Sequence, residues 1–218
     1  GSFLSDLERE LQDINTVARA AARHLDGDVL LVGILPTLQK QHLGLEYMSP
    51  APRYHELNRT MVELSGGSFR ADIQGMDELK LQHDNVMLEA CNTSFQLHWQ
   101  VSAEEFAQAY NIAQLITAPL LAASVNSPVL FRRRLWHETR IALFEQSVDV
   151  RDEASAERGQ SRRVGFGDAW INEGVSELFL GNVADHRVVL SRNTGESSSA
   201  MLARGEMPPL TALCLHNG

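Results

Sequence analysis

Cysteine is scarce in this chain of 218 residues. The two cysteines, Cys91 and Cys214, lie far apart and form no CxxC pair, so they support neither a disulfide framework nor a thiolate metal site. Long apolar runs are also absent, because no eighteen consecutive residues are apolar, and the N-terminus lacks a signal-peptide pattern. These absences predict a soluble protein of the reducing cytoplasm, without membrane association.

An excess of positive charge is missing as well. The chain has 19 lysines and arginines against 28 aspartates and glutamates, which gives a formal net charge of -9. Because non-specific nucleic-acid binding depends on basic surfaces, nucleic acid is excluded as a partner. The apolar fraction of 44% and the charged fraction of 22% are ordinary for a globular protein.

Several catalytic motifs are absent too. Neither GxxxxGK[ST] nor GxGxxG occurs, so phosphate binding by either glycine-rich loop is unsupported, and there is no GxSxG elbow. The segment HETRI at 137–141 begins like the zinc-protease helix motif, but Ile141 stands where the second histidine is required. We therefore do not predict a metalloprotease.

The two ends of the sequence suggest processing. Gly1-Ser2 precede any methionine, which is typical of a cloning remnant, and the last residues are the apolar run LTALCLHNG. These ends predict that residues 1–218 are a single-domain fragment of a longer chain.

Apolar residues recur at helical spacing in several segments. In residues 3–24, Leu4, Leu7 and Leu11 share one face, and the DGD sequence that follows ends the helix. The same spacing, with Pro52 in a first turn or a Ser102–Glu105 capping box, predicts further helices. These span residues 52–64, 102–123 and 171–180, and a second amphipathic segment spans about 130–147.

Shorter runs of strand character lie between these helices. They are residues 28–35, 69–75, 79–83, 95–101 and 187–191. Because helices and strands mix without regular βαβ alternation, we predict an α+β fold. The charged segment 151–163 and the small-residue segment 193–200 are predicted to be mobile loops.

The segment FQLHWQV at 95–101 has the clearest alternation in the chain. Gln96 and His98 would project to the same side of a strand, about 7 Å apart. An imidazole binds metals or phosphate, and an amide hydrogen-bonds phosphate. The alternative, which stays open at this point, is the outward face of an ordinary antiparallel sheet.

A second candidate is FRRRLWHETR at 131–140, where four arginines surround a tryptophan, a histidine and a glutamate. Guanidinium groups grip carboxylates and phosphates through paired hydrogen bonds. A solvated helix face is the competing interpretation. A weaker third candidate is the polar group His83, Asp84 and Glu89, where Asp84-Asn85 is also good turn chemistry.

Five segments in order resemble one family. They are GILPT (33–37), MSPAPRY (48–54), LEACNTSFQLH (88–98), NSP (126–128) and RRRLWHETR (132–140). Together they are similar to the plant and bacterial glutamate–cysteine ligase family, above all to its bacterial carboxylate–amine ligase-like members. The resemblance spans about residues 3–218 and is strongest between 30 and 150.

This resemblance implies a fold and a reaction. The fold would be related to glutamine synthetase and the guanidino kinases, with a curved antiparallel sheet around the active site and helices packed on its convex face. The reaction would use ATP to phosphorylate the γ-carboxylate of glutamate, and an amine such as cysteine, as in glutathione biosynthesis, would attack the acyl phosphate. Magnesium ions would neutralise the phosphates.

The resemblance also assigns roles to residues. Gln96 matches a metal- or phosphate-contacting position, and His98 follows on the same side, so both are predicted cofactor contacts and metal ligands. Arg132 matches an arginine that contacts the substrate carboxylate. Arg132 and Arg140 are the predicted catalytic residues, and Trp136 and Glu138 extend the substrate-binding wall. Asn126 is expected to hold its turn.

Two departures from the family pattern change the expectations. Glu89 stands where plant members have an arginine, so the acceptor amine need not be cysteine. The acidic metal ligands of the family would lie ahead of residue 3, and a further arginine- and glutamate-bearing segment would follow the last residue, so we expect the fragment alone to be inactive. A degenerate relative that binds an amino acid or nucleotide for regulation is the main alternative, and an interaction domain without a ligand is another.

Overall fold

The computed structural model describes residues 3–186, 188–189 and 196–208, and the chain divides into two compact units, Gly1–Val32 and Gly33–Gly218. The first unit is built on α1 (Phe3–Arg23), which confirms the first predicted helix. Its end is a local feature of the DGD sequence, because Asp26 has a φ of 53° and the Gly27 N–H donates to the Ala22 carbonyl at 2.9 Å. None of the described helices has both the length and the apolar character needed to cross a membrane.

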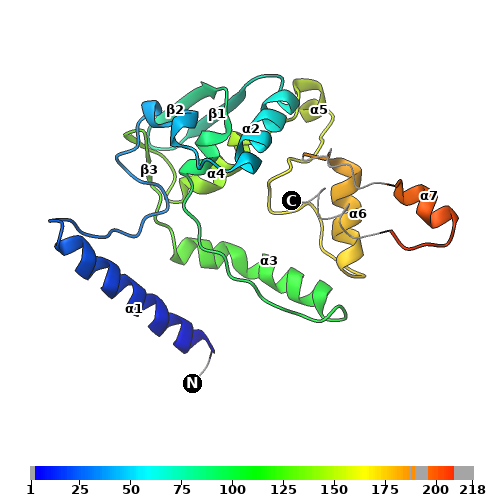
Figure 1. The fold of residues 1–218 in the computed structure, drawn as a ribbon, viewed down its shortest axis with the longest axis horizontal. Coiled ribbons are helices and arrows are strands. Elements are labelled where there is room, and N and C mark those ends of the chain that lie inside the picture. The colour runs from blue at the N-terminus through cyan, green and yellow to red at the C-terminus, as the bar shows by residue number, and fades with distance from the viewer. Residues whose placement is uncertain (1–2, 187, 190–195, 209–218) are drawn as a thin grey trace. The chain divides into compact units, whose positions relative to one another are not determined.

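The second unit mixes helices with two small antiparallel sheets, which confirms the α+β class (Figure 1). Its helices are α2 (Pro52–Leu64), α3 (Phe106–Ala123), α4 (Thr139–Ser147), α5 (Glu153–Glu157), α6 (Val175–Asp185) and α7 (Ser198–Ala203). Its strands are β1 (Phe69–Gln74), β2 (Glu78–His83), β3 (Val129–Leu130) and β4 (Arg133–Arg134). Three short 3-10 helices complete the list: η1 (Lys40–His42), η2 (Leu45–Tyr47) and η3 (Val86–Cys91).

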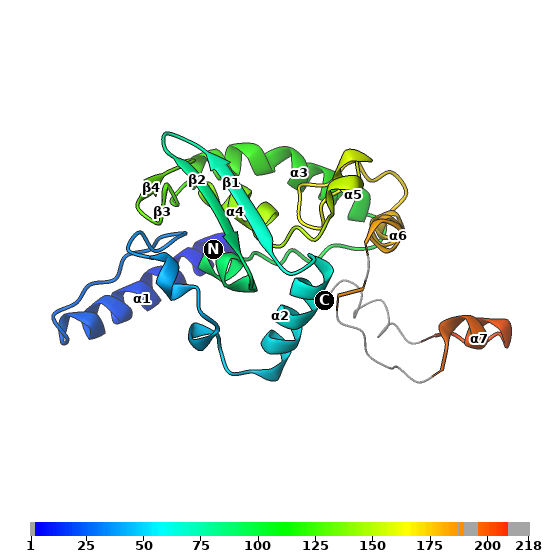
Figure 2. The ribbon, with the colours of Figure 1, turned by 90° about the horizontal axis from the view of Figure 1, so that it is seen from above.

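The hairpin of β1 and β2 confirms two predicted strands. Its register runs from Phe69 opposite His83 to Gln74 opposite Glu78, and burial alternates along both strands. Because alternate side chains point to opposite faces, one face of the hairpin is apolar and the other meets water. Figure 2 shows the two strands side by side with α4 close to them, and α4 contacts β1.

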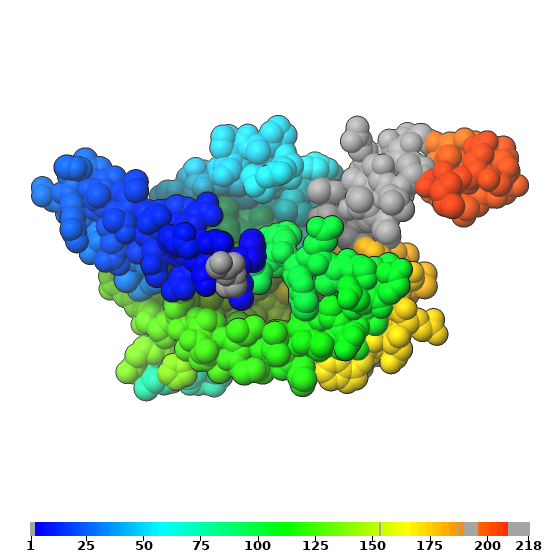
Figure 3. Space-filling view, turned by 90° about the horizontal axis from the view of Figure 1, so that it is seen from below, coloured from blue at the N-terminus to red at the C-terminus, as the bar shows by residue number. Residues whose placement is uncertain are grey.

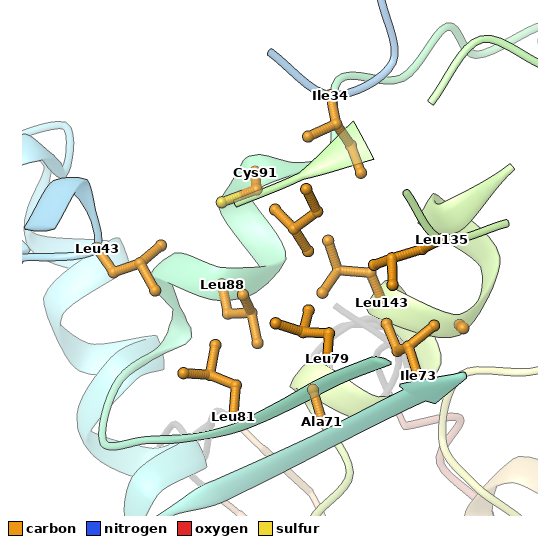
Figure 4. Packing of buried hydrophobic residues seen from close by; sticks show 12 residues of the cluster. Ile34, Leu43, Ala71, Ile73, Leu79, Leu81, Leu88, Cys91, Leu135 and Leu143 are labelled. Carbon is orange, nitrogen blue, oxygen red and sulfur yellow. The ribbon is translucent and has the colours of Figure 1, made fainter. Parts of the chain in front are cut away.

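The main core lies between this apolar face, η3 and α4. Figure 4 shows side chains from these elements pointing toward one another, with Ile34 and Leu43 joining from the preceding loop. Leu88, Leu130 and Leu143 have no measurable exposure. A second, smaller cluster forms beneath α2 from Met61, Phe69, Val86 and Val189.

The bounds of α2 match the prediction because its start and stop signals are local. Pro52 occupies the first turn, where its missing N–H costs nothing. After the helix, Gly66 and Gly67 adopt φ values of 74° and 103°, which side-chain-bearing residues seldom adopt.

Two predicted strands are wrong. Residues 28–35 are irregular, with Leu30 and Leu31 about 70% exposed, and residues 92–102 are irregular as well. A strand forms only where a neighbour accepts its backbone hydrogen bonds. Among the described residues, Gly33 in the first segment bonds only to Asn126 and Thr93, and residues 94–101 make no backbone hydrogen bond to another segment.

Other boundaries differ in smaller ways. The capping contact of Ser102 with Glu105 forms, but α3 begins only at Phe106, and it has no buried residue; Figure 3 shows its side chains at the surface of the second unit. The segment 130–147 becomes the β3–β4 hairpin followed by α4, and is helical only in its second half. The last predicted helix shifts from 171–180 to Val175–Asp185.

The mobility predicted for segments 151–163 and 193–200 stays a prediction. Within 151–163 the structure has the short helix α5, and α7 begins at the end of 193–200. The predicted strand at 187–191 lies mostly outside the described residues, as do residues 1–2 and the final run 210–218.

Gly75 sits where the β1–β2 turn meets the β4 segment. A Cβ added there would lie 2.5 Å from the Cα and carbonyl carbon of Leu135, which are backbone atoms that cannot rotate away. We expect Gly75→Ala to lower the free energy of unfolding by about 1–3 kcal/mol through overpacking. Gly165→Ala is the matched control, because no atom lies within 4 Å of its added Cβ, and it should change stability by less than about 0.5 kcal/mol. Equal urea midpoints for the two variants would contradict the close packing at Gly75.

His83 ends β2 with its ring 5.4 Å from the ring of Phe69, and both ring nitrogens are buried without a hydrogen-bond partner in the described structure. Burial lowers the pKa of this imidazole. The unfolded chain therefore binds the proton more tightly, and stability should fall as pH drops below the unfolded value of about 6.5. We expect His83→Phe to lose less unfolding free energy than the wild type between about pH 7 and pH 5, measured by denaturation at each pH. Parallel pH profiles would show that His83 stays solvated.

Candidate functional site

The β3–β4 hairpin places Arg132 at its tip. Leu130 pairs with Arg133, so Phe131 and Arg132 form a two-residue turn, and their φ values are 48° and 63°. Such turns favour glycine and asparagine, and a left-handed conformation costs other residues on the order of 1 kcal/mol or more. The Phe131 side chain packs against the main core, which holds the turn in place. Arg132 is exposed and makes no hydrogen bond or ion pair with any described residue.

The hairpin is fixed to the β1–β2 turn through Asp77. The Arg134 N–H donates to the Asp77 carboxylate at 2.7 Å, and the Asp77 N–H donates to the Arg134 carbonyl at 2.8 Å. The backbone bond from Arg134 is the main reason why the pKa of the Asp77 carboxyl is lowered. The Trp136 indole donates to the Gln74 carbonyl at 2.9 Å, so this predicted substrate contact has a hydrogen bond within the protein.

Glu138 is the most buried residue of the predicted site, at 5% exposure. Arg140 Nε donates to one of its carboxylate oxygens at 2.6 Å, and Arg140 Nη2 donates to the other at 2.8 Å. The Ser127 hydroxyl also donates to this carboxylate. Burial opposes the charge on Glu138, but the hydrogen bonds from Arg140 and Ser127 outweigh it and lower the pKa of the carboxyl.

The remaining nitrogens of Arg140 reach two distant segments. Nη1 donates to the Thr93 carbonyl at 2.5 Å, and Nη2 donates to the Asn126 side-chain oxygen at 3.0 Å. Gly33 closes the ring, because its N–H donates to the Asn126 carbonyl and its carbonyl accepts from the Thr93 N–H. A Cβ on Gly33 would lie 2.6 Å from Arg140 Nε. We call the six residues joined in this way the Arg140 network: Gly33, Thr93, Asn126, Ser127, Glu138 and Arg140.

Gln96 and His98 lie in the irregular segment that follows Thr93. Both side chains are exposed, and neither makes a hydrogen bond with the described residues. The Arg140 network fixes the start of this segment at Thr93, but no hydrogen bond in the described structure joins Gln96 or His98 to Arg132. The structure therefore brings together Asn126, Glu138 and Arg140 and leaves the other predicted groups separate.

The polar group at 83–89 is also divided. His83 packs against Phe69, and the Asn85 side-chain oxygen accepts from the Met87 N–H at 2.9 Å, as expected of a turn. Glu89 faces a cavity that is described below. No set of three or more histidine, cysteine, aspartate or glutamate side chains that could hold a metal ion occurs in the described part of the chain.

Sequence reasoning missed Gly33 and Thr93 as members of the network. A signal was present for Gly33, because a glycine inside an apolar run often marks a close backbone approach. Thr93 contributes only its backbone groups to the network, which no side-chain pattern reveals.

The family comparison covers these segments. The model of glutamate-cysteine ligase family 2 (GCS2) matches residues 2–161, which is well over half of the chain. The chain belongs to glutamate-cysteine ligase family 2. No curated protein and no solved structure matches it. The family match confirms the resemblance seen in the sequence, and it includes the Arg140 network and the hairpin tip.

In this ligase-family chain, Arg140 has a structural role that can be tested. Removing its side chain would leave Glu138 buried without its cation, which typically costs about 3–5 kcal/mol. We expect Arg140→Ala to lower the unfolding free energy by an amount in this range, measured by urea denaturation. Arg133→Ala, at an exposed position without an ion pair among the described residues, is the control and should stay within about 0.5 kcal/mol of wild type. A fully stable Arg140→Ala variant would mean that Arg140 does not hold the fold together.

Proposed function

We propose that this protein is an ATP-dependent carboxylate–amine ligase that forms a γ-glutamyl amide. Membership of glutamate-cysteine ligase family 2 indicates a ligase. The observation that supports the site is the Arg132 guanidinium, which has no partner among the described residues and is held at a hairpin tip by the packing of Phe131. An arginine without a protein partner is suited to bind a carboxylate or a phosphate of a substrate.

The proposed reaction has two steps. An oxygen of the glutamate γ-carboxylate attacks the terminal phosphorus of ATP, and ADP leaves with the electrons of the broken P–O bond. The nitrogen of a neutral amine then attacks the acyl carbon, phosphate leaves, and the nitrogen loses a proton to give the amide. Both steps involve anionic groups whose charge a guanidinium stabilises.

In this proposal Arg132 binds a substrate carboxylate, and Trp136 forms the wall beside it. The indole N–H of Trp136 is already bonded to the Gln74 carbonyl. The residue is 43% exposed, so the face of its ring is the part left for substrate contact. For Arg140 and Glu138 we propose a positioning role in addition to the catalytic and substrate-binding roles predicted from the sequence. Their hydrogen bonds to each other and to Thr93 and Asn126 support a role in positioning the site.

Gln96 and His98 remain proposed contacts for phosphate or metal. Their exposed amide and imidazole suit hydrogen bonds to phosphate oxygens. Two side chains, one of them a nitrogen ligand, do not form a magnesium site, because that ion prefers six oxygen ligands. No step of the proposal therefore depends on a metal held by these two residues.

The family fold gives the segment 95–101 a further proposed role. We propose a fold related to glutamine synthetase, as the family resemblance implies, in which the exposed polar side chains of this irregular segment face the substrates. A cytoplasmic place and a part in glutathione biosynthesis are proposed on the same family basis.

The ligase proposal predicts that Arg132→Ala weakens substrate binding without loss of stability. We expect glutamate with ATP and magnesium to raise the melting temperature of the wild type, since a ligand at 100 times its dissociation constant adds about 2.7 kcal/mol. Arg132→Ala should lose most of this shift, while Arg70→Ala, an exposed arginine on the outer face of β1, should keep it. Because we expect residues 1–218 alone to be inactive, amide formation is measured in the longer chain that the sequence analysis predicts. Formation of a γ-glutamyl amide there, followed by mass spectrometry over a panel of amines, should likewise fall in Arg132→Ala and in His98→Ala.

The outcomes separate the proposed functions. Amide formation that requires ATP, glutamate and an amine supports the ligase. A thermal shift with ATP or glutamate, but no amide with any amine, supports a regulatory binding module instead. If the protein shows no thermal shift and forms no amide, both the ligase and the regulatory binding module are overturned.

A further inference from the structure

A cavity of about 690 Å³ opens beside the second core cluster of the 33–218 unit. This volume is typical of sites for small organic ligands. Its walls come from η2, α2, η3, α4 and α6, five elements that the chain reaches at widely separated positions. The cavity is therefore a product of the tertiary fold.

The walls of this cavity are mainly apolar and aromatic. Tyr54 and Met61 line it from α2, Met87 from η3 and Phe144 from α4, and Tyr47 lies at one side. Tyrosine, phenylalanine and methionine side chains pack well against an apolar or aromatic body. The shape and lining fit a ligand with such a body.

Glu89 is the carboxylate of this cavity. It lies on η3, is half-buried, and makes no side-chain hydrogen bond or ion pair with any residue that the structure describes. Burial raises the pKa of the Glu89 carboxyl, with no compensating contribution from a cation. Arg163 also lines the cavity and has an interaction of its own, but it does not contribute to the pKa shift of Glu89. A positively charged ligand group beside Glu89 would therefore be stabilised.

A larger cavity of about 760 Å³ offers a useful contrast. Two of its arginines are already paired, Arg151 with Asp149 at 2.7 Å and Arg162 with Glu145 at 2.7 Å. Their charges are satisfied by the protein itself. The Glu89 cavity differs because its acidic group lacks such a partner in the described structure.

We propose that the Glu89 cavity binds a primary amine with an apolar, aromatic-sized body, its ammonium group pairing with Glu89. The inference rests on the proposed ligase function in one respect: there the amine is the acceptor substrate, and its ammonium group gives a proton to the Glu89 carboxylate before the neutral nitrogen attacks. Two connections along the chain link the cavity to the Arg140 network. Phe144 follows Arg140 by one turn of α4, and η3 leads directly into Thr93, whose carbonyl Arg140 holds.

The test is the binding of 2-phenylethylamine to the 218-residue protein by isothermal titration calorimetry, without nucleotide or glutamate. We expect saturable binding to the wild type and at least tenfold weaker binding to Glu89→Gln, which keeps the shape of the side chain and removes its charge. The neutral analogue 2-phenylethanol should bind at least tenfold more weakly than the amine to the wild type. Glu46→Gln, an exposed carboxylate on η2 outside the cavity lining, is the matched control and should bind the amine like the wild type.

A second variant keeps the test decisive if Glu89→Gln does not fold. Ala90 is exposed and lines the cavity, so Ala90→Phe should fill it and abolish amine binding while circular dichroism stays unchanged. Equal amine affinity of the wild type and Glu89→Gln, equal affinity for the alcohol, or no amine binding would each overturn the proposal. The failure of the Glu89 amine site is distinguishable from the failure of the ligase proposal. If Glu89→Gln still forms the amide with an unchanged KM for the amine, only the Glu89 site is overturned. If the amine binds in a charge-dependent way but no amide forms, only the role of the amine as acceptor substrate is overturned.

Discussion

The guanidinium of Arg140 is the group on which the candidate site depends. It uses three nitrogens to bond the buried carboxylate of Glu138, the backbone of Thr93 and the side chain of Asn126. A planar fork with five fixed donors suits this task, which a lysine would not perform in the same way. Gly33 leaves the space that the guanidinium occupies. Four chain segments are thereby held together around one cation.

This arrangement separates residues that position the site from residues free to bind. Arg140 donates hydrogen bonds to Glu138 and Asn126 within the protein. Trp136 likewise donates its indole N–H to the Gln74 carbonyl. Arg132 is the opposite case: it occupies a strained turn and has no described partner. Strained backbone conformations persist where surrounding packing fixes them, here through Phe131, and they often occur at functional positions. The proposed substrate contact is thus the arginine that the fold itself does not use.

The Glu89 cavity also combines groups that the fold uses with one group that is free to bind. Its apolar walls belong to the packing of α2 and α4, while its carboxylate lacks a described partner. In the resemblance that the sequence shows, this position departs from the plant pattern, and the structure places it in a cavity of ligand size. In our proposal, the residue type at this position determines which acceptor amine the cavity binds.

The sequence by itself determined the features whose causes are local. Proline and paired glycines set the ends of α2, alternation set the β1–β2 hairpin, and ordered motifs identified the family. Only the tertiary structure decided that residues 95–99 do not form a strand despite their alternation. A strand exists only if a partner satisfies its backbone hydrogen bonds. It also decided that Arg140 meets Thr93, Asn126 and Gly33, contacts made across long stretches of chain. No local pattern encodes which distant carbonyl a guanidinium will reach.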